Sequence, residues 1–477
     1  MSTDNQPTFY WLDYETFGID PARDKACQFA GVRTDADFNI IGEPLVIYCQ
    51  PTDDYLPSPE ATLVTGITPQ LAKEKGLSEP EFIAAIHKEL TQPGTCVVGY
   101  NNIRFDDEVT RHLLYRNFYD PYAWAWQNGN SRWDLLDVLR TCYALRPEGI
   151  EWPIDEDTGL VSFKLERLSV ANGIEHSNAH DAMADVIATI EMAKKVKQAQ
   201  PKLFEYLYDL RNKKKVQSLL DPVNMAPIVH VSGMLGGQCG NTSWMVPMAW
   251  HPTNNNAMIC INLAKDPTPL FELDADTLRQ RLYTKQSALA EGELPVPVKL
   301  IHINKCPSVA PAKTLTANDA ERLGIDREYC LNNLKALRNA PEIREKLLQL
   351  FTDDSNKNAH SEKPLDARLY DGFFSYNDKT ALDIIRETSP EKLAFLTLNV
   401  EDERIKPLVF QYRARHFPHT LSEQEQQRWY YARRDYFESE LPRYMSNLEG
   451  LAQQYAHDPD KLKLLESVYR YVESIAS

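Results

Sequence analysis

The first part of the chain alternates apolar and polar residues in the manner of β-strands. Residues 9–17 are mostly apolar and carry Asp13 and Glu15 at alternate positions. Because the side chains of a strand point to its two faces in turn, both carboxylates are expected on the same face. Two more β-rich segments, residues 28–33 and 40–48, follow after short turns. The pattern predicts an antiparallel meander of three strands that opens a mixed sheet.

Helical periodicity follows the meander and alternates with a further strand. Thr68 and Pro69 are typical of an N-cap and a first helical position, and residues 80–90 carry apolar side chains at helical spacing. Residues 95–100 predict a buried strand, after which asparagines suit a turn that leads into a helix beginning near Asp106. Asp106 is therefore expected at the carboxyl end of a strand, where ligands gather in open α/β sheets. The alternative is an ordinary acid at a helix N-terminus.

Two more helices are predicted before the middle of the chain. Residues 132–144 have an amphipathic pattern, and another helix is expected to start at residue 162. His180 and Asp185 are five positions apart, which on one helix would separate them by roughly 140°. We therefore expect His180 in the loop before a helix and Asp185 one turn inside it, so that both side chains can point to the same site.

The pattern changes again in the second half. Residues 226–305 contain β-rich runs broken by Gly and Asn, which predict a small barrel or sheet domain. Helices are predicted at residues 316–322 and 326–352, and the polar residues after Thr352 predict a linker. The remainder is helical in pattern, and residues 404–443 interleave arginine with aromatic residues. The arginines can bind the phosphates and the aromatic rings can stack on the bases of single-stranded nucleic acid. Alternatively, these side chains pack together in a helical core.

Composition and charge add limited information about the number of domains and about binding to nucleic acid. A length of 477 residues favours about three domains, and a hydrophobic fraction of 43% provides material for several cores. The net charge of −16 argues against a protein that coats nucleic acid non-specifically. It leaves room for a local basic groove, because charges beyond a Debye length of roughly 8 Å are screened.

The cysteines and the N-terminus bear on the cellular compartment. The eight cysteines are dispersed without a Cys-x-x-Cys pair, which fits neither a zinc site nor a disulfide framework, so we expect reduced thiols. No apolar run is long enough to cross a bilayer. The first residues also lack the basic and apolar regions of a signal peptide. These features predict a cytoplasmic protein with no membrane partner.

The pair Asp13 and Glu15 is the first candidate for chemistry. Two like charges on a mostly buried strand repel each other and are costly to desolvate. A hard divalent metal, Mg²⁺ or Mn²⁺, prefers oxygen ligands and would offset both costs. A lone Asp-x-Glu is more often the solvent-exposed polar face of an edge strand. Other segments of the chain must therefore show whether the pair binds a metal.

Three motifs in this chain resemble, in the same order, those of the DEDDh family of 3′–5′ exonucleases. They are Asp13-x-Glu15, Asn-x-x-x-Phe-Asp106 and His180-x-x-x-x-Asp185. Longer stretches look like bacterial exonuclease I, a branch of that family; these are residues 65–68, 99–111, 119–124, 175–185, 230–233, 302–307 and 412–415. The resemblance covers essentially the whole chain.

The resemblance implies an α/β (α+β) fold with three domains that close around single-stranded DNA. The implied parts are a ribonuclease-H-like mixed-sheet exonuclease domain at residues 1–200, an SH3-like domain with flanking helices at 201–352, a linker at 353–364 and a helical C-terminal domain at 365–477. It also implies a role in DNA repair and recombination, and a protein that is monomeric. A chain ending near Thr352 is then expected to cleave short oligomers and to lose its processivity on long strands.

The resemblance also assigns residues. The implied catalytic residues are Asp13, Glu15, Asp106, His180 and Asp185. The implied substrate contacts are Thr16, Phe17, Asn102 and Phe163. The family binds the acidic and hydrophobic C-terminal tail of single-stranded DNA-binding protein, for which the matching segments provide Arg146, Tyr206 and Arg338.

The chemistry of these residues suits phosphodiester hydrolysis. Four carboxylates can hold two Mg²⁺ ions, with Mn²⁺ as a substitute, at the spacing of roughly 3.5–4 Å that stabilises the attacking and leaving oxygens of an in-line displacement. His180, with an ordinary pKa of about 6.5, can act as general base toward the attacking water. The expected product is a nucleoside 5′-monophosphate released from a 3′ end.

Two other functions stay open at this stage. A 3′–5′ exoribonuclease or a proofreading nuclease would use the same five residues, and the motifs do not distinguish DNA from RNA. A non-catalytic nucleic-acid-binding scaffold is the remote alternative, and the complete set of carboxylates and histidine counts against it.

Overall fold

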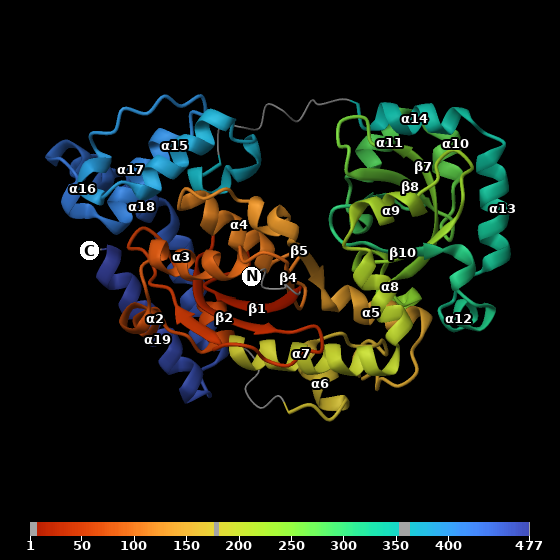
Figure 1. Cartoon of the computed structure of the whole chain (residues 1–477), viewed down its shortest axis with the longest axis horizontal. Helices are drawn as coiled ribbons and strands as arrows, with labels where there is room; N and C mark the ends of the chain where they lie inside the picture. The colour runs from red at the N-terminus through yellow and green to blue at the C-terminus, as the bar shows by residue number, and fades with distance from the viewer. Residues whose placement is uncertain (1–6, 176–180, 353–362, 477) are drawn as a thin grey trace, which may run out of the picture. The chain divides into compact units, whose positions relative to one another are not determined.

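A computed structural model describes residues 7–175, 181–352 and 363–476 (Figure 1). Contacts divide the chain into two compact units. The first unit comprises Met1–Arg132, His176–Ile187 and His360–Ser477, and the second comprises Trp133–Glu175 and Ala188–Ala359. Within the described ranges no helix has the length and apolar content that crossing a bilayer requires.

The centre of the first unit is a five-stranded mixed sheet in the order β3-β2-β1-β4-β5. The strands are β1 Thr8–Thr16, β2 Ala26–Thr34, β3 Leu45–Tyr48, β4 Thr95–Gly99 and β5 Ser131–Asp134. β1 pairs with β2 and β2 with β3 in antiparallel fashion, whereas β1 and β4 are parallel. The predicted meander is confirmed, and β1 lies at the middle of the sheet.

Helices cover this sheet and close its core. They are α1 Pro59–Thr65, α2 Pro69–Lys75, α3 Glu79–Leu90 and α4 Asp106–Arg116, and α7 Ala182–Ala199 begins in this unit. The Thr68 side chain accepts a hydrogen bond from the Leu71 backbone N–H at 3.2 Å, which is the predicted cap. Apolar side chains of β1, β2 and β4 pack with Phe82, Ile86 and Leu113 of α3 and α4.

The C-terminal helices belong to the same compact unit as this sheet. They are α15 Tyr376–Glu387, α16 Pro390–Leu393, α17 Ile405–His416, α18 Glu423–Gln454 and α19 Pro459–Ala476. Tyr115 and Phe118 share a buried cluster with Leu382 of α15, and Leu56 shares another with Phe437 and Tyr471. The predicted linker falls mostly outside the described residues.

The second unit contains another five-stranded sheet, in the order β10-β6-β7-β8-β9. Its strands are β6 Ile228–Val231, β7 Thr242–Trp250, β8 Ala257–Asn262, β9 Val298–His302 and β10 Ser308–Pro311. All neighbouring pairs are antiparallel. This is the small β domain that the sequence predicts.

The second unit also contains helices. They are α5 Leu135–Leu145, α6 Leu165–Ala171, α8 Pro201–Asp209, α9 Lys213–Leu219, α10 Thr268–Glu272, α11 Ala275–Leu282, α12 Ala317–Arg322, α13 Arg327–Arg338 and α14 Glu342–Leu350.

Three predicted helices in this part of the chain have different boundaries. The helix predicted at 132–144 begins only at Leu135, because the preceding residues form β5. The helix predicted from residue 162 begins at Leu165. The single helix predicted at 326–352 is two helices, since Pro341 cannot continue α13 and stands at the start of α14.

Candidate active site

Strand β1 brings two carboxylates to one face of the central sheet. Asp13 is paired with Ala30 of β2 and Glu15 with Gln28, so the regular alternation holds through both residues. The register shifts immediately afterwards, between Glu15 and Thr16. Glu15 is buried and Asp13 half-buried. The expectation that the two acids share one face is met.

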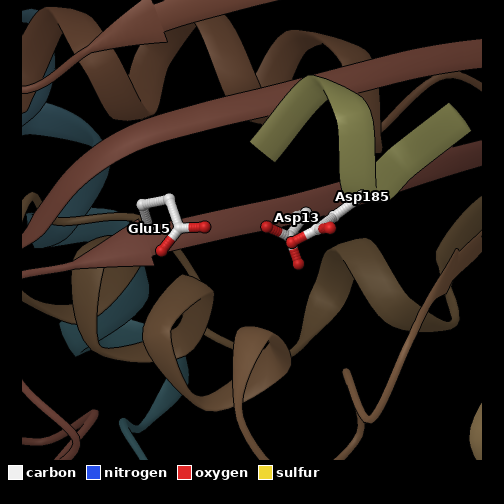
Figure 2. Close-up of side chains that lie close together, drawn as sticks. All are labelled: Asp13, Glu15 and Asp185. Carbon is white, nitrogen blue, oxygen red and sulfur yellow. The ribbon is translucent and has the colours of Figure 1, made fainter. Parts of the chain in front are cut away.

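Asp185 reaches the same place from helix α7. One ligand oxygen each of Asp13, Glu15 and Asp185 lies within 4.8 Å of the others. Figure 2 shows the carboxylates of Asp13 and Asp185 side by side, with that of Glu15 pointing toward them. Asp185 lies in the first turn of α7, as its spacing from His180 predicts. His180 itself lies outside the described residues.

Asp106, the first residue of α4, lies beside this group of three, and its charge contributes to the raised pKa of Asp13 and of Glu15. Its side chain is buried, and its Oδ1 accepts a hydrogen bond from the Tyr14 backbone N–H at 3.1 Å. Strands β1 and β4 pair only as far as Trp11 and Val98. Tyr14 lies beyond this parallel pairing, so its backbone N–H donates to Asp106 and not to a carbonyl of β4. This hydrogen bond holds the Asp106 carboxylate against β1 at Tyr14.

The acids strongly perturb one another. Burial, followed by repulsion from Asp106, Glu15 and Asp185, raises the pKa of Asp13 well above its usual range. Burial and the charges of Asp185 and Asp106 raise the pKa of Glu15 to about 8. Ionised carboxylates in such a place need a compensating positive charge.

The donor set fits a hard divalent cation. All donors in the cluster are carboxylate oxygens, the ligands that Mg²⁺ and Mn²⁺ prefer, whereas zinc sites are usually rich in histidine and cysteine. Asp181 contributes further negative charge, because it adds to the raised pKa of both Asp13 and Glu15. Its side chain accepts a hydrogen bond from the Ala184 N–H at 3.2 Å at the start of α7.

The expected substrate contacts are placed in different ways. Thr16 ends β1, and its hydroxyl donates to the Gly18 carbonyl at 2.6 Å. Phe17 is 1% exposed and Asn102 is 0% exposed, so neither residue is open to substrate in this structure. Phe163 belongs to the second unit, half-buried, with its ring 5.8 Å from that of Tyr143.

The expected partner contacts lie in the second unit. Arg146 and Tyr206 line one cavity of about 290 Å³ between α5, α8, β6 and β10. The Tyr206 hydroxyl donates to the Val309 carbonyl at 2.9 Å. Arg338 does not line this cavity, and its guanidinium donates to the carbonyls of Asn224 and Met225.

Several of the arginines and aromatic residues between 404 and 443 serve packing. Arg413 pairs with Glu425 at 2.8 Å and Arg415 with Asp54 at 2.9 Å. Phe437 is buried, whereas Tyr430 is 60% exposed. The packing alternative therefore accounts for several of these side chains.

Two residues beside the cluster, Asp107 and Arg132, are not among the predicted site residues. Arg132 stands at the start of a segment predicted to be a helix, but it forms a buried ion pair with Asp107, next to Asp106. The adjacent acids at 106 and 107 were the only signal in the sequence, because the partner on β5 is distant along the chain.

Comparison with known proteins agrees with this geometry over the whole chain. Family models match residues 10–193 (Exonuclease), 211–353 (Exonuclease I SH3-like domain) and 363–475 (Exonuclease I C-terminal domain). A mixed sheet with clustered carboxylates that matches the first model defines a hydrolytic nuclease of the exonuclease class.

The chain belongs to the exodeoxyribonuclease I family. It is 57% identical over 471 residues to exodeoxyribonuclease I of Escherichia coli K12, with 98% of each chain covered. It is 54% identical over 469 residues to that of Haemophilus influenzae, covering 97% of this chain and 98% of the relative. The fold class expected from the sequence is confirmed.

Solved structures of the E. coli enzyme are similar throughout. A complex with a dA16 oligonucleotide has a TM-score of 0.95 at 57% identity and covers 98% of this chain and 100% of the other. A zinc-bound complex of that enzyme with single-stranded DNA has a TM-score of 0.95 at 56% identity, covering 99% and 100%. An SSB/exonuclease I structure with an inhibitor has a TM-score of 0.92 at 56% identity and the same coverage.

Proposed function

We propose that this chain is a Mg²⁺-dependent exonuclease that degrades single-stranded DNA processively from the 3′ end to deoxynucleoside 5′-monophosphates. The carboxylate cluster of Asp13, Glu15 and Asp185, completed by Asp106, is the observation that carries the proposal. Membership of the exodeoxyribonuclease I family and the likeness to single-stranded DNA complexes of the E. coli enzyme support the choice of substrate.

The four carboxylates would hold the metal ions. Divalent cations bound there would stabilise the charge that develops on the attacking and leaving oxygens of the phosphodiester. Mg²⁺ is proposed as the resident ion, with Mn²⁺ as a substitute, because every donor is a hard oxygen. Zinc binding by the E. coli enzyme is consistent with a divalent site and does not identify the ion used here.

His180 is proposed as the general base. It would take a proton from the attacking water, whose oxygen forms the new bond to phosphorus while the bond to the 3′ oxygen of the preceding nucleotide breaks. The terminal nucleotide then leaves with a 5′-phosphate. Thr16 is the proposed substrate contact nearest to Glu15 in the sequence. Phe17, Asn102 and Phe163 stay candidates that rest on the resemblance alone.

A second part of the proposal concerns the protein partner. The similar SSB/exonuclease I structure supports single-stranded DNA-binding protein as a partner of this chain. The cavity lined by Arg146 and Tyr206 is mostly apolar and has two cationic residues, Arg146 and Lys202, in its lining, which suits an acidic and hydrophobic tail. Arg338 would extend this surface outside the cavity.

The deciding experiment compares matched oligonucleotides. Single- and double-stranded DNA and RNA of one sequence, labelled at the 5′ end, are incubated with Mg²⁺, Mn²⁺ or EDTA. We expect a ladder of products shortened from the 3′ end only with single-stranded DNA and a metal ion. Faster degradation of RNA would favour the exoribonuclease alternative, and no degradation of any substrate would favour the scaffold.

Other expectations from the sequence stay predictions. They are the boundaries of the three domains, a monomeric and cytoplasmic protein, and a role in DNA repair and recombination. The identity of His180 as the base belongs with them, because it lies outside the described residues.

A further inference from the structure

A buried ion pair lies directly beside the carboxylate cluster and has no part in the function proposed above. Asp107 of α4 is 1% exposed and Arg132 of β5 is 8% exposed, and the Arg132 Nη1 forms a short ion pair with the Asp107 Oδ2. Both residues belong to the first unit. Asp107 follows Asp106 in the chain, so any shift of Asp107 is passed to Asp106 through a single peptide bond.

The other oxygen of Asp107 closes the loop that leads into α4. The Asn102 Nδ2 donates to the Asp107 Oδ1 at 3.3 Å, and the Asp107 backbone N–H donates to the Asn102 carbonyl at 2.8 Å. Asp107 therefore joins the end of β4, the start of α4 and strand β5. Both carboxylate oxygens of Asp107 are used within the protein.

The loop is also pressed against β1. A Cβ atom added at Gly99 would lie 2.7 Å from the Asn102 Cβ and 2.9 Å from the Leu12 carbonyl oxygen. Only glycine at position 99 lets the end of β4 lie this close both to Asn102 and to the Leu12 carbonyl of β1. The loop is thus held from three sides, by β1, by β5 and by the first turn of α4.

We propose that Asp107 and Arg132, with Asn102, are positioning residues that hold Asp106 in the geometry required for cation binding. The hydrogen bond from the Tyr14 N–H to the Asp106 Oδ1 directly restrains Asp106. The ion pair adds a second restraint one residue further along, so the Asp106 carboxylate is fixed in direction as well as in place. A metal site tolerates little displacement of its ligands, and outer partners of ligands typically contribute 10- to 100-fold to affinity.

A purely structural role predicts something different. Buried ion pairs contribute little to stability compared with a well-packed apolar pair, while removal of one partner is strongly destabilising. A structural pair would therefore affect unfolding and leave the metal site of the folded protein unchanged. The two roles are separated by measuring metal affinity at temperatures where every variant is folded.

The chain offers a matched control on the same helix. Glu79 of α3 pairs with Arg116 at the other end of α4, through hydrogen bonds of 3.2 and 2.9 Å, and the side chains are 5% and 3% exposed. The variants Asp107→Asn and Glu79→Gln each remove one negative charge from a buried ion pair of α4. Only the first of these pairs adjoins Asp106.

The experiment is a Mn²⁺ titration of the full chain by electron paramagnetic resonance, with thermal melts of each variant. We expect D107N to bind Mn²⁺ roughly tenfold more weakly or worse, and E79Q to bind it within about twofold of the wild type even if its melting temperature falls as far. Wild-type affinity in D107N, or an equal loss in E79Q, would overturn the inference.

A milder variant covers the case in which D107N does not fold. Arg132→Lys keeps the charge and loses the planar fork, so it should fold, bind Mn²⁺ more weakly and show a lower kcat at saturating Mn²⁺. Unchanged Mn²⁺ affinity in R132K also counts against the inference. The proposal rests on the metal site proposed above, and the failure of each can be told apart. A wild type that binds no Mn²⁺ contradicts the metal site. Equal binding by wild type, D107N and R132K contradicts only the positioning role.

Discussion

At the scale of single residues, the candidate site is a group of acids that the fold holds close together against their mutual repulsion. Glu15 illustrates the cost, since burial and the charges of Asp185 and Asp106 raise its pKa to about 8. Asp13 is shifted in the same direction for the same reasons. A cation is expected to replace the retained protons, so that metal binding, folding and pH are coupled.

The stability of the metal-free protein should therefore depend on Glu15. Between its ordinary pKa of 4.5 and the value of about 8, the folded chain retains a proton that the unfolded chain releases. Stability in EDTA should fall as the pH rises through that window. Melting temperatures at pH 5 and pH 8 should thus differ more in the wild type than in Glu15→Gln, and Mg²⁺ should reduce the difference. Equal changes in both proteins would contradict the raised pKa.

Asp185→Asn should remove turnover while it leaves the fold intact. The substitution takes away one charged ligand oxygen of the cluster and keeps the shape of the side chain. We expect the rate to fall by roughly 100-fold or more, with little change in the affinity for single-stranded DNA measured by fluorescence anisotropy. A variant that degrades DNA close to the wild-type rate would remove Asp185 from the site.

At the scale of elements, the second unit shows how helices and strands form a binding surface that no single segment contains. Helices α5 and α8 and strands β6 and β10 enclose the cavity of about 290 Å³. Arg146 follows the last residue of α5, and Tyr206 of α8 is tied to β10 through the Val309 carbonyl. The polar groups at this cavity are therefore held by different elements.

Arg146→Ala should weaken binding of a peptide with the acidic and hydrophobic tail of single-stranded DNA-binding protein. The reason is the loss of one of the two cations that line the cavity, Arg146 and Lys202, and the attraction should also decline with salt. Fluorescence anisotropy at low and high salt measures both effects, with Arg167→Ala on α6 as the control because Arg167 lies outside the cavity and pairs with Asp155. Equal binding by R146A and the wild type would place the tail elsewhere.

At the scale of the whole molecule, the C-terminal segment is part of the unit that contains the candidate site. Lys25 pairs with Asp366 at 2.6 Å, and Arg415 bridges Asp366 and Asp54 at 3.0 and 2.9 Å, all with side chains at most 12% exposed. Together with the shared apolar clusters around Tyr115 and Leu56, these contacts join residues hundreds of positions apart.

A chain ending at Thr352 should therefore fail to fold well, in contrast to the expectation from the sequence that it would still cleave short oligomers. Truncation leaves Lys25 buried without its partner and exposes Tyr115, Phe118 and Leu56. Asp366→Asn in the full chain isolates the ionic part and should cost about 3–5 kcal/mol. Circular dichroism and thermal melts test both proteins, and a truncated chain that melts and cleaves like the wild type would show that the segment is dispensable.

The sequence by itself determined the features that depend on neighbours within a few residues. The alternation of β1 places Asp13 and Glu15 on one face, the Thr68-Pro69 pair starts α2, and the turn after β4 leads into α4 at Asp106. Such features follow from backbone geometry and local hydrogen bonds, which a short stretch of sequence specifies. The motif order was also sufficient to find the family.

Only the tertiary structure decided which distant residues meet. Arg132 has a periodicity compatible with a helix, yet it lies in β5, where it reaches Asp107, 25 positions away. Asp366, in a stretch expected to begin a separate domain, pairs with Lys25, 341 positions away. Which segments pair depends on burial and on charge compensation between them. Neither leaves a pattern in the local sequence, because the free energy of a buried ion depends on whether its partner, from another segment, is in place.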